Sequence, residues 1–152
     1  MYRGAALSIG SATFTVSATV DKDCLVTANT IDLGAVPSTA ANITSSGTLG
    51  VTCSNGTPYY VGLAPSNGSG TGAGTMKGTL SGNTDLVPYQ LRSTAGLGGT
   101  PWGNTATSTS VGNGVAGTGS GLSQPKTVYV TAPNANFRPD SYSDTVTVNV
   151  NY

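Results

Sequence analysis

The sequence contains no histidine and no glutamate, and charged residues of any kind make up only 8% of its 152 residues. It therefore lacks the side chains that most often act as general bases or activate nucleophiles. Six lysines and arginines balance six aspartates to a net charge of zero, whereas nucleic-acid binding rests on many cationic contacts to phosphate. These shortages argue against an enzyme and against a nucleic-acid-binding protein.

Ligands for metals and cofactors are equally scarce. Two cysteines without histidine cannot complete a zinc site, and no ligand loop surrounds Asp21 and Asp23 to build a calcium site. Residues 112–117 match a dinucleotide-binding fingerprint by letters, but glycine and serine follow where a helix is needed. No apolar run is long enough to cross a membrane. We expect no cofactor, no metal and no membrane insertion.

Cys24 and Cys53 each stand at the end of a strand-like run. A disulfide between them would close a loop of about 29 residues and stabilise the fold by roughly 3–4 kcal/mol. The alternative is a pair of free, buried thiols. We favour the disulfide, and with it an oxidising compartment.

Short alternating runs separated by Gly, Asn, Pro and Ser clusters are typical of an all-β sandwich or barrel. The pattern predicts strands over residues 13–20, 30–35, 48–53, 58–63, 76–80, 86–92, 127–131 and 142–152. Pro88 indicates an edge or a bulge in its strand. The glycine-rich residues 66–75 and 112–121 are predicted to be surface loops. Trp102 is interpreted as a partly buried core residue, with a sugar-stacking aromatic as the alternative.

The end of the chain has the clearest strand pattern. Val146, Val148, Val150 and Tyr152 alternate with threonine and asparagine, which predicts one apolar face and one polar face. As the last strand of a sheet it would be a long unprotected edge, which soluble proteins normally block with charge, proline or a bulge. We expect another segment to cover it.

Near the N-terminus the apolar alternation changes face. Residues 12–20 place Phe14 and Val16 on one face, whereas Leu7 and Ile9 alternate in the opposite register. A slip of one residue reverses the two faces, so the segments before and after it are not expected to form one flat strand. The start of the chain is interpreted as a mature or engineered N-terminus, because its apolar stretch is short for a signal peptide.

The order of several short motifs resembles the spore coat protein U domain, which is also the subunit domain of archaic chaperone–usher pili. The matching stretches run over nearly the whole chain: Phe14-Thr-Val16-Ser-Ala-Thr-Val20 leading to Cys24, Ile31-Asp-Leu33-Gly34, Leu49 to Tyr59 with Cys53, Pro88-Tyr89-Gln-Leu91, Trp102-Gly, and Tyr142-Ser-Asp144-Thr-Val146-Thr-Val148. The chain departs from the family pattern at Asp140-Ser141 and at Val130, where the family has glycine at the corresponding turn or bulge.

The resemblance implies an incomplete immunoglobulin-like β-sandwich that lacks its last strand. A periplasmic chaperone fills the resulting groove first, and at the outer-membrane usher the N-terminal extension of another copy replaces it. The implied function is a structural subunit of an extracellular pilus that reaches the cell surface through the periplasm and serves adhesion and biofilm formation. The alternative is a self-contained secreted coat or carbohydrate-binding domain.

The resemblance also implies two sets of site residues. Residues 1–12, or up to about residue 16, are expected to be a donor-strand extension, and residues 13–152 the pilin domain. An inserted strand places alternate side chains in pockets, and Leu7 and Ile9 are the main candidates. The full donor set is Ala5, Leu7, Ile9, Ala12 and Phe14, and the expected acceptor groove is lined by Val16, Val20, Val146, Val148, Val150 and Tyr152.

Overall fold

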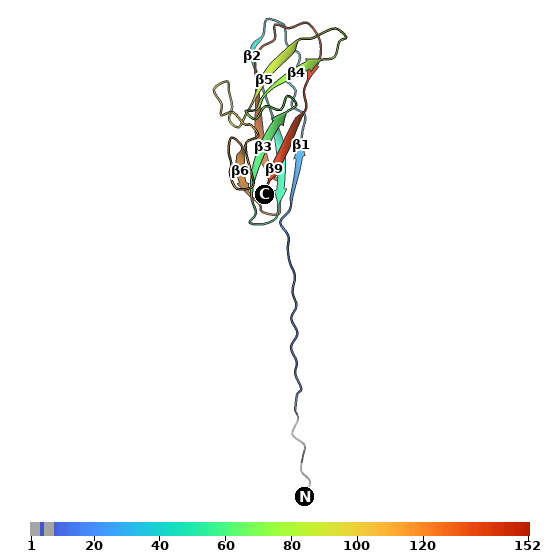
Figure 1. Cartoon of the computed structure of the whole chain (residues 1–152), viewed down its shortest axis with the longest axis vertical. Helices are drawn as coiled ribbons and strands as arrows, with labels where there is room; N and C mark the ends of the chain where they lie inside the picture. The colour runs from blue at the N-terminus through green and yellow to red at the C-terminus, as the bar shows by residue number, and fades with distance from the viewer. Residues whose placement is uncertain (1–3, 5–7) are drawn as a thin grey trace.

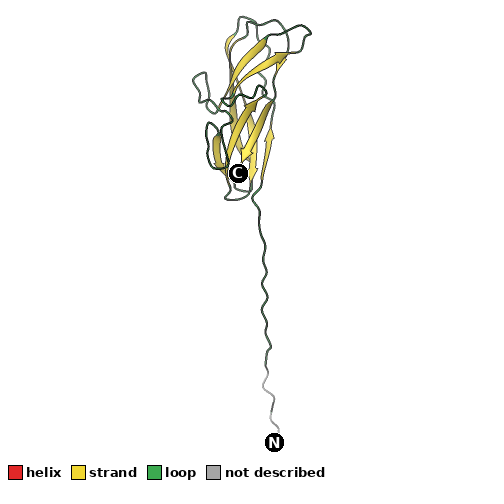
Figure 2. Ribbon diagram, viewed as in Figure 1, coloured by secondary structure: helices red, strands yellow, loops and turns green. Residues whose placement is uncertain are grey.

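The structure is a computed structural model that describes residue 4 and residues 8–152. Within them the chain forms nine strands and no helix, which confirms the all-β prediction (Figure 2). In chain order the strands are β1 (Cys24–Ala28), β2 (Ala41–Cys53), β3 (Pro58–Pro65), β4 (Ala73–Gly78), β5 (Leu86–Arg92), β6 (Val115–Thr118), β7 (Gln124–Asn134), β8 (Tyr142–Ser143) and β9 (Val146–Asn151). No described segment is a helix of the length and hydrophobicity that crossing a bilayer requires.

The strands form two antiparallel sheets that enclose one core. The larger sheet has the order β1-β2-β7-β5-β4-β8, and the smaller has the order β6-β3-β9. Inward-facing side chains of β2, β5 and β7 meet those of β3 between the sheets, in the manner of a β-sandwich. The buried core residues are Leu49, Val51, Cys53, Tyr59, Val61, Leu63, Tyr89, Leu91, Trp102, Val128 and Val130.

Trp102 is a core residue and is 0% exposed. Its indole Nε1–H donates a hydrogen bond of 2.8 Å to the backbone oxygen of Val61. Its backbone N–H donates to the oxygen of Leu91 in the other sheet, at 2.9 Å. The residue thus bonds to both sheets, through its indole to β3 and through its backbone to β5, and its side-chain polar group is satisfied, as a buried tryptophan requires. The core interpretation is confirmed, and the sugar-stacking alternative is wrong.

The Cys24–Cys53 disulfide predicted from the sequence is present. It links β1 to β2 at the last pair of their ladder, which runs from Ala28–Leu49 to Cys24–Cys53. Beyond Cys53 the chain turns into β3, with the N–H of Thr57 donating to the oxygen of Ser54 at 3.0 Å. The bridge therefore closes the end of the sheet where the N-terminal segment enters the domain.

The predicted strand over residues 13–20 is wrong. Residues 8–22 form no strand, and Figure 1 shows them extending away from the domain. The reason lies in the β1–β2 register, because β2 ends at Cys53 opposite Cys24. Residues before Cys24 run past the end of the sheet and have no residue of β2 to pair with. The first strand of the domain therefore begins at Cys24.

Three further predictions differ from the structure in detail. Residues 30–35 form no strand; their segment contacts β2, where Ile31 packs over Gly47 and the backbone oxygen of Asp32 accepts a hydrogen bond from Ser45 Oγ at 2.9 Å. Pro88 lies in β5, which is not an edge strand. The pairing of β5 with β7 covers only Gln90–Arg92, so no strand lies beside Pro88 on that side to need the N–H that proline lacks. Part of the predicted loop at residues 112–121 forms β6.

The disulfide yields a first prediction. Replacing both cysteines by serine should lower the free energy of unfolding by about 3 kcal/mol, since the bridge no longer restricts the unfolded chain. Urea unfolding of the wild type and the double variant measures this difference. In the native wild type, a thiol probe should label neither cysteine until a reductant is added. Labelling without reductant would refute the bridge.

Candidate functional site

The last strand, β9, has a hydrogen-bonding partner on one side only. It pairs with β3 from Tyr60–Asn151 to Pro65–Val146, and it stands at the end of the smaller sheet. β1 likewise pairs only with β2 and stands at the end of the larger sheet. Figure 1 shows β1 and β9 next to each other. Two unpaired strand edges therefore lie side by side at one border of the sandwich.

Half-buried apolar side chains line this border. From β9 the three alternating valines pack against the core, as the sequence predicted for the inner face of the last strand. From the other sheet come two residues of β1 and two of the irregular segment that follows it. The set, here called the open edge, is Cys24, Val26, Ile31, Leu33, Val146, Val148 and Val150. Each contacts the core while part of its surface stays uncovered.

The structure brings together only part of the predicted acceptor groove. Val146, Val148 and Val150 lie at the open edge. Tyr152 is 36% exposed and lies at the end of the open edge beside the disulfide, which is called the lower end. Val16 and Val20 do not: they lie on the extended segment, with 84% and 88% of their surface exposed. Their predicted place in the acceptor groove is wrong, because both residues precede Cys24, where the pairing of β1 with β2 begins.

The wall opposite β9 consists of Cys24, Val26, Ile31 and Leu33, which sequence reasoning missed. In the structure Cys24 and Val26 are half-buried while Leu25 between them is 66% exposed, an alternation that the sequence does not show because all three residues are apolar. That alternation continues from the disulfide in the period of a strand. The run is too short to be recognised without knowing where β2 ends.

The predicted donor residues lie on the N-terminal segment. Ala5 and Leu7 fall outside the described residues, and Ile9 is 92% exposed. Ala12 and Phe14 are exposed on the same extended segment, Phe14 at 88%. None of the described donor residues touches the core of its own chain.

Residues 11–20 combine the alternation of a strand with nearly complete exposure. One face carries only apolar side chains and the other only hydroxyl groups. The apolar face is Ala12, Phe14, Val16, Ala18 and Val20, and the hydroxyl face is Ser11, Thr13, Thr15, Ser17 and Thr19. Large apolar groups at such exposure are costly in water, by about 1.5–3 kcal/mol each relative to burial. Burial of the apolar face against another surface would therefore be favourable.

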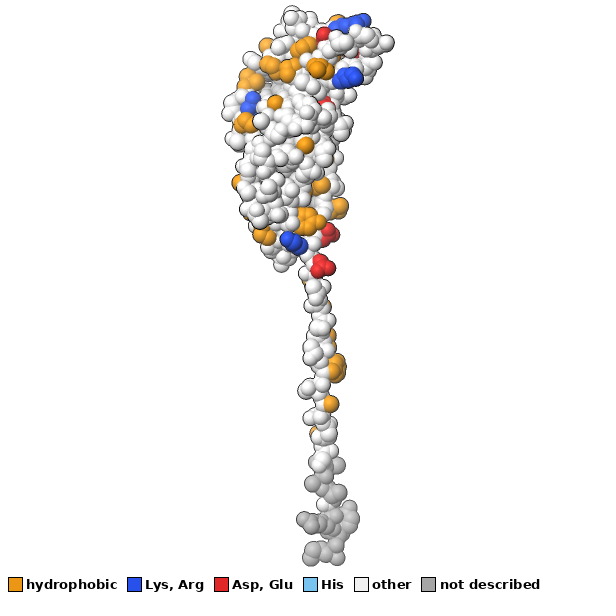
Figure 3. Space-filling view, viewed as in Figure 1, with side chains coloured by type: hydrophobic (Ala, Val, Ile, Leu, Met, Phe, Trp, Pro, Cys, Tyr) orange, Lys and Arg blue, Asp and Glu red, His pale blue; other side chains and the backbone are white. Residues whose placement is uncertain are grey.

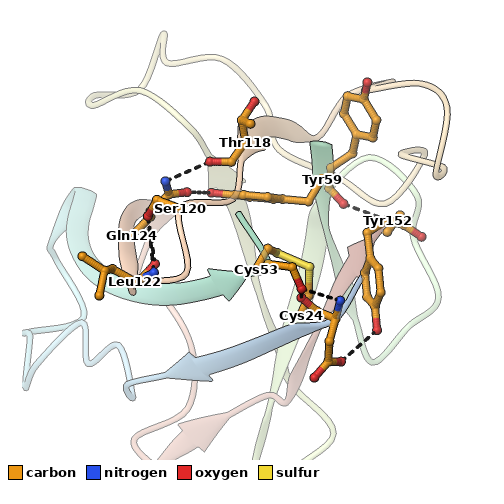
Figure 4. Close-up of a disulfide and its surroundings, with 12 residues drawn as sticks. Cys24, Cys53, Tyr59, Thr118, Ser120, Leu122, Gln124 and Tyr152 are labelled. Atoms are coloured by element: carbon orange, nitrogen blue, oxygen red, sulfur yellow. Dashed lines mark hydrogen bonds between the residues drawn. A yellow bond between two sulfur atoms is a disulfide. The ribbon is translucent and has the colours of Figure 1, made fainter. Parts of the chain in front are cut away.

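The lower end of the open edge is formed by the disulfide and by both ends of the domain. The hydroxyl of Tyr152 reaches Asp23 Oδ1 at 3.4 Å, and the N–H of Asp23 donates to Ser54 Oγ at 2.8 Å. Figure 4 shows Tyr152 beside the Cys24–Cys53 bridge. The point where the extended segment leaves the domain therefore lies beside the end of the last strand.

Asp144 defines the upper end, between β8 and β9. Its carboxylate accepts hydrogen bonds from Tyr89 Oη at 2.5 Å and from Ser66 Oγ. Burial, and then the hydrogen bond and charge of Asp144, raise the pKa of Tyr89 above its ordinary value, so its hydroxyl remains a donor. The predicted strand over residues 142–152 is interrupted at Asp144, because β8 belongs to the larger sheet and β9 to the smaller one.

Two other features of the described surface were candidates for a chemical site. Two shallow hollows of about 290 and 240 Å³ lie along β5 and β7, lined by residues that include Arg92, Tyr129 and Thr131. In the described part of the chain no three metal-ligating side chains cluster. Residues 112–117 lead into β6 and not into a helix, so the phosphate-binding geometry of the fingerprint does not form.

One family model matches most of the chain. The family model of the Spore Coat Protein U domain matches residues 11–149. The chain belongs to the Spore Coat Protein U domain family. The fold is accordingly an immunoglobulin-like β-sandwich, as the family resemblance implied. No curated protein matches the chain.

Two solved structures have folds similar to that of this chain. One is the complex of the chaperone CsuC with CsuE, the tip adhesion subunit of archaic chaperone–usher Csu pili from Acinetobacter baumannii, with 26% identity and a TM-score of 0.55. The other is a chaperone–tip adhesin complex of CFA/I fimbriae, with 12% identity and a TM-score of 0.51. The chain is covered to 88% and 84%, but it spans only 40% and 42% of the matched chains.

The upper end of the open edge gives a second prediction. In the Asp144→Asn variant, the side-chain amide keeps one oxygen for the hydroxyls of Tyr89 and Ser66 and loses its charge. We expect the free energy of unfolding to fall by about 1.5–3 kcal/mol, the usual contribution of hydrogen bonds to a charged group. Urea unfolding measures the change. The matched control is Asp32→Asn, an exposed carboxylate that accepts one bond, from the N–H of Gly34, and should change stability far less.

Proposed function

We propose that this protein is a structural subunit of a surface pilus and that its copies join by donor-strand exchange. The observation that carries the proposal is the pairing of features within one chain. The open edge lacks a strand beside β9, while residues 11–20 are an exposed strand pattern with no place in their own domain. One copy supplies what the next copy lacks.

Backbone and side chains both support this fit. A strand inserted beside β9 would pair with the unused N–H and C=O groups of its free edge, which otherwise remain with water. Its apolar face would cover the exposed parts of Val146, Val148 and Val150. Burial of Phe14, Val16 and Val20 would contribute about 5–9 kcal/mol in sum, before the cost of association.

The exposed, uninterrupted alternation of residues 11–20 favours a donor register different from the one expected from the sequence. From the sequence we expected Leu7 and Ile9 to be the main inserted side chains. We now propose Ala12, Phe14, Val16, Ala18 and Val20, because this face alternates without interruption up to the start of the domain. Phe14 and Ala12 remain from the first set. Val16 and Val20 move from the acceptor to the donor side of the joint.

The partners follow from the same gap. A subunit with an open edge is prone to aggregate, so a periplasmic chaperone is proposed to cover the edge before assembly. The solved relatives support this, since both structures are chaperone–subunit complexes. An outer-membrane usher and further copies of the chain complete the proposed route to the cell surface. Adhesion and biofilm formation are the proposed roles of the filament, with this chain in the shaft or in an adaptor position.

A third prediction tests the register by charge placement. Phe14→Asp and Val16→Asp would each bury a carboxylate in an apolar groove, so polymers should fail to form. Thr15→Asp lies between them on the hydroxyl face and should still polymerise. Leu7→Asp and Ile9→Asp should polymerise as well. Native gels and electron microscopy of the full chain score the outcome.

Loss of polymers in the Leu7 and Ile9 variants, with normal polymers from the Phe14 and Val16 variants, would favour the register that inserts Leu7 and Ile9.

A deletion of residues 2–22 tests the function itself. It should abolish filaments, while the remaining domain binds a synthetic peptide of residues 11–20. Filaments formed by the deletion variant, or a stable full-length monomer without a chaperone, would favour a self-contained coat or carbohydrate-binding domain.

A further inference from the structure

The outer face of the larger sheet is polar across three neighbouring strands, β2, β7 and β5. Along each strand the side chains alternate between the core and this outer face. The ladder registers place outward-facing residues in two rows across the strands: Ser46, Tyr129 and Arg92 in one row, and Thr44, Thr131 and Gln90 in the next. The open edge, in contrast, consists of side chains that pack against the core. The outer face is therefore a separate surface.

A closed loop, residues 93–100, follows β5 and borders this face. The N–H of Ser93 donates to the backbone oxygen of Thr100 at 2.8 Å, and the N–H of Gly99 donates to that of Gly96 at 3.0 Å. Leu97 lines the larger of the two hollows, of about 290 Å³, and Gly96 lines the smaller, of about 240 Å³. The hollows thus lie between the strands and a loop that its own backbone hydrogen bonds hold in shape.

Of the described residues that line the two hollows, only Arg92 is charged. Its Nε donates a hydrogen bond to Thr131 Oγ1 at 3.0 Å, and its Nη1 donates to the backbone oxygen of Gly99 at 2.6 Å. Both partners are neutral, and neither bond uses Nη2. The guanidinium is half-buried and held in place. It can therefore still donate to an anion, and little side-chain ordering remains to be done.

None of the six aspartates lines either hollow. The one nearest to β5 in sequence, Asp85, accepts a hydrogen bond from the N–H of Arg138 at 2.8 Å. Asp144 bonds to Tyr89, whose side chain turns from β5 into the core and so away from the outer face. Figure 3 shows how sparse charged side chains are over the surface that it displays. An anion that enters the hollows would meet the charge of Arg92 without a competing carboxylate in their walls.

Neutral polar groups border the guanidinium. Gln90 Nε2 donates to the backbone oxygens of Thr71 and Leu91, both at 2.9 Å, which holds the side-chain amide and leaves its oxygen as an acceptor. Asn42 lines the larger hollow with a backbone φ of 55°, and every other positive φ in the described chain belongs to glycine. Residues held in this region are frequent at ligand sites. Hydrogen-bonding groups suited to hydroxyls therefore surround the charge.

The lining as a whole indicates a class of ligand. A guanidinium matches the planar carboxylate group better than other anions of its size, because its N–H groups form a fork. Amides and hydroxyls are partners for sugar hydroxyls, while Leu97, Pro133 and Tyr129 offer apolar surface for the C–H face of a sugar ring. The hollows are shallow and share Thr131. Neighbouring shallow hollows suit consecutive units of a chain better than one enclosed small molecule.

We infer that the outer face of β2, β7 and β5 binds an acidic saccharide, a chain of sugars that carries carboxylate groups. Arg92 holds one carboxylate at the larger hollow, and the hydroxyl side chains of the smaller hollow bind the neighbouring sugar. The site does not depend on donor-strand exchange. If copies do form a filament, each carries the site, and a long polysaccharide engages many of them at once, so that weak binding per copy suffices.

A fourth prediction concerns the ligand and is measured by calorimetric titration of the full chain. The probes are tetragalacturonic acid and a hyaluronan tetrasaccharide, each compared with its methyl ester, and acetate. The acids should bind in a salt-dependent way. The esters should bind at least about tenfold more weakly, because they lack the charged partner of Arg92. Acetate should show no binding at the same concentrations, since it lacks the sugar contacts.

Two variants test the site itself. Leu97→Asp places a carboxylate in the larger hollow and leaves both hydrogen bonds of Arg92 intact, and it should weaken binding of the acids about tenfold. Leu122→Asp is the matched control, on a loop residue that is 73% exposed and lines neither hollow. Arg92→Gln should weaken binding at least as much. Its control is Arg138→Gln, which removes the same charge from an exposed side chain elsewhere.

Urea unfolding shows whether each variant is folded. Absence of binding by both acids, or equal binding of acids and esters, would overturn the inferred site. Equal binding of acetate would reduce it to a site for any small carboxylate and so contradict the saccharide. Unaltered binding in both the Leu97 and Arg92 variants would place the ligand elsewhere on the protein.

Discussion

The free edge of β9 is the feature on which the rest of this structure depends. Backbone groups of a strand need partners, and here half of them face no strand of their own sheet. The valines of β9 are correspondingly half-buried, held by the core on one side only. In the proposed joint a second copy would supply the missing strand, so that assembly would complete the fold and would need no separate binding surface.

The disulfide and the composition are consistent with that reading. The Cys24–Cys53 bridge closes the larger sheet beside the point where the extended segment departs, so the segment cannot lengthen β1 along β2. A chain with 8% charged residues has little electrostatic protection against self-association. In the proposed subunit the first feature would keep residues 11–20 outside their own domain, and the second would permit close packing of copies.

The sequence predicts what depends on local pattern and fails where the pattern needs a partner. Alternation was sufficient for β9, β3 and β5, and the all-β class followed from turn residues without helical periods. The same alternation in residues 13–20 was interpreted as a strand of the domain, because a period of two does not say which chain supplies the neighbouring strand. Only the register, with β2 ending opposite Cys24, showed that the segment has no place in its own sheet. The place of Ile31 and Leu33 in the wall opposite β9 was likewise hidden, because their alternation predicted a strand over residues 30–35, whereas they pack against the core without forming one.

The side chains and the backbone of the proposed joint would contribute in different ways. Burial of several apolar side chains is worth several kcal/mol and depends little on salt. Backbone hydrogen bonds add less net free energy, but they give the groups on the free edge of β9 the partners that they lack in the isolated domain. The alternation of residues 11–20 would also fix which face of the inserted strand turns inward, because a slip by one residue would bury the hydroxyl face in place of the apolar one. Strength would therefore come from the apolar face and register from the strict period of two, and neither needs a charged side chain, in keeping with a chain in which only 8% of the residues are charged.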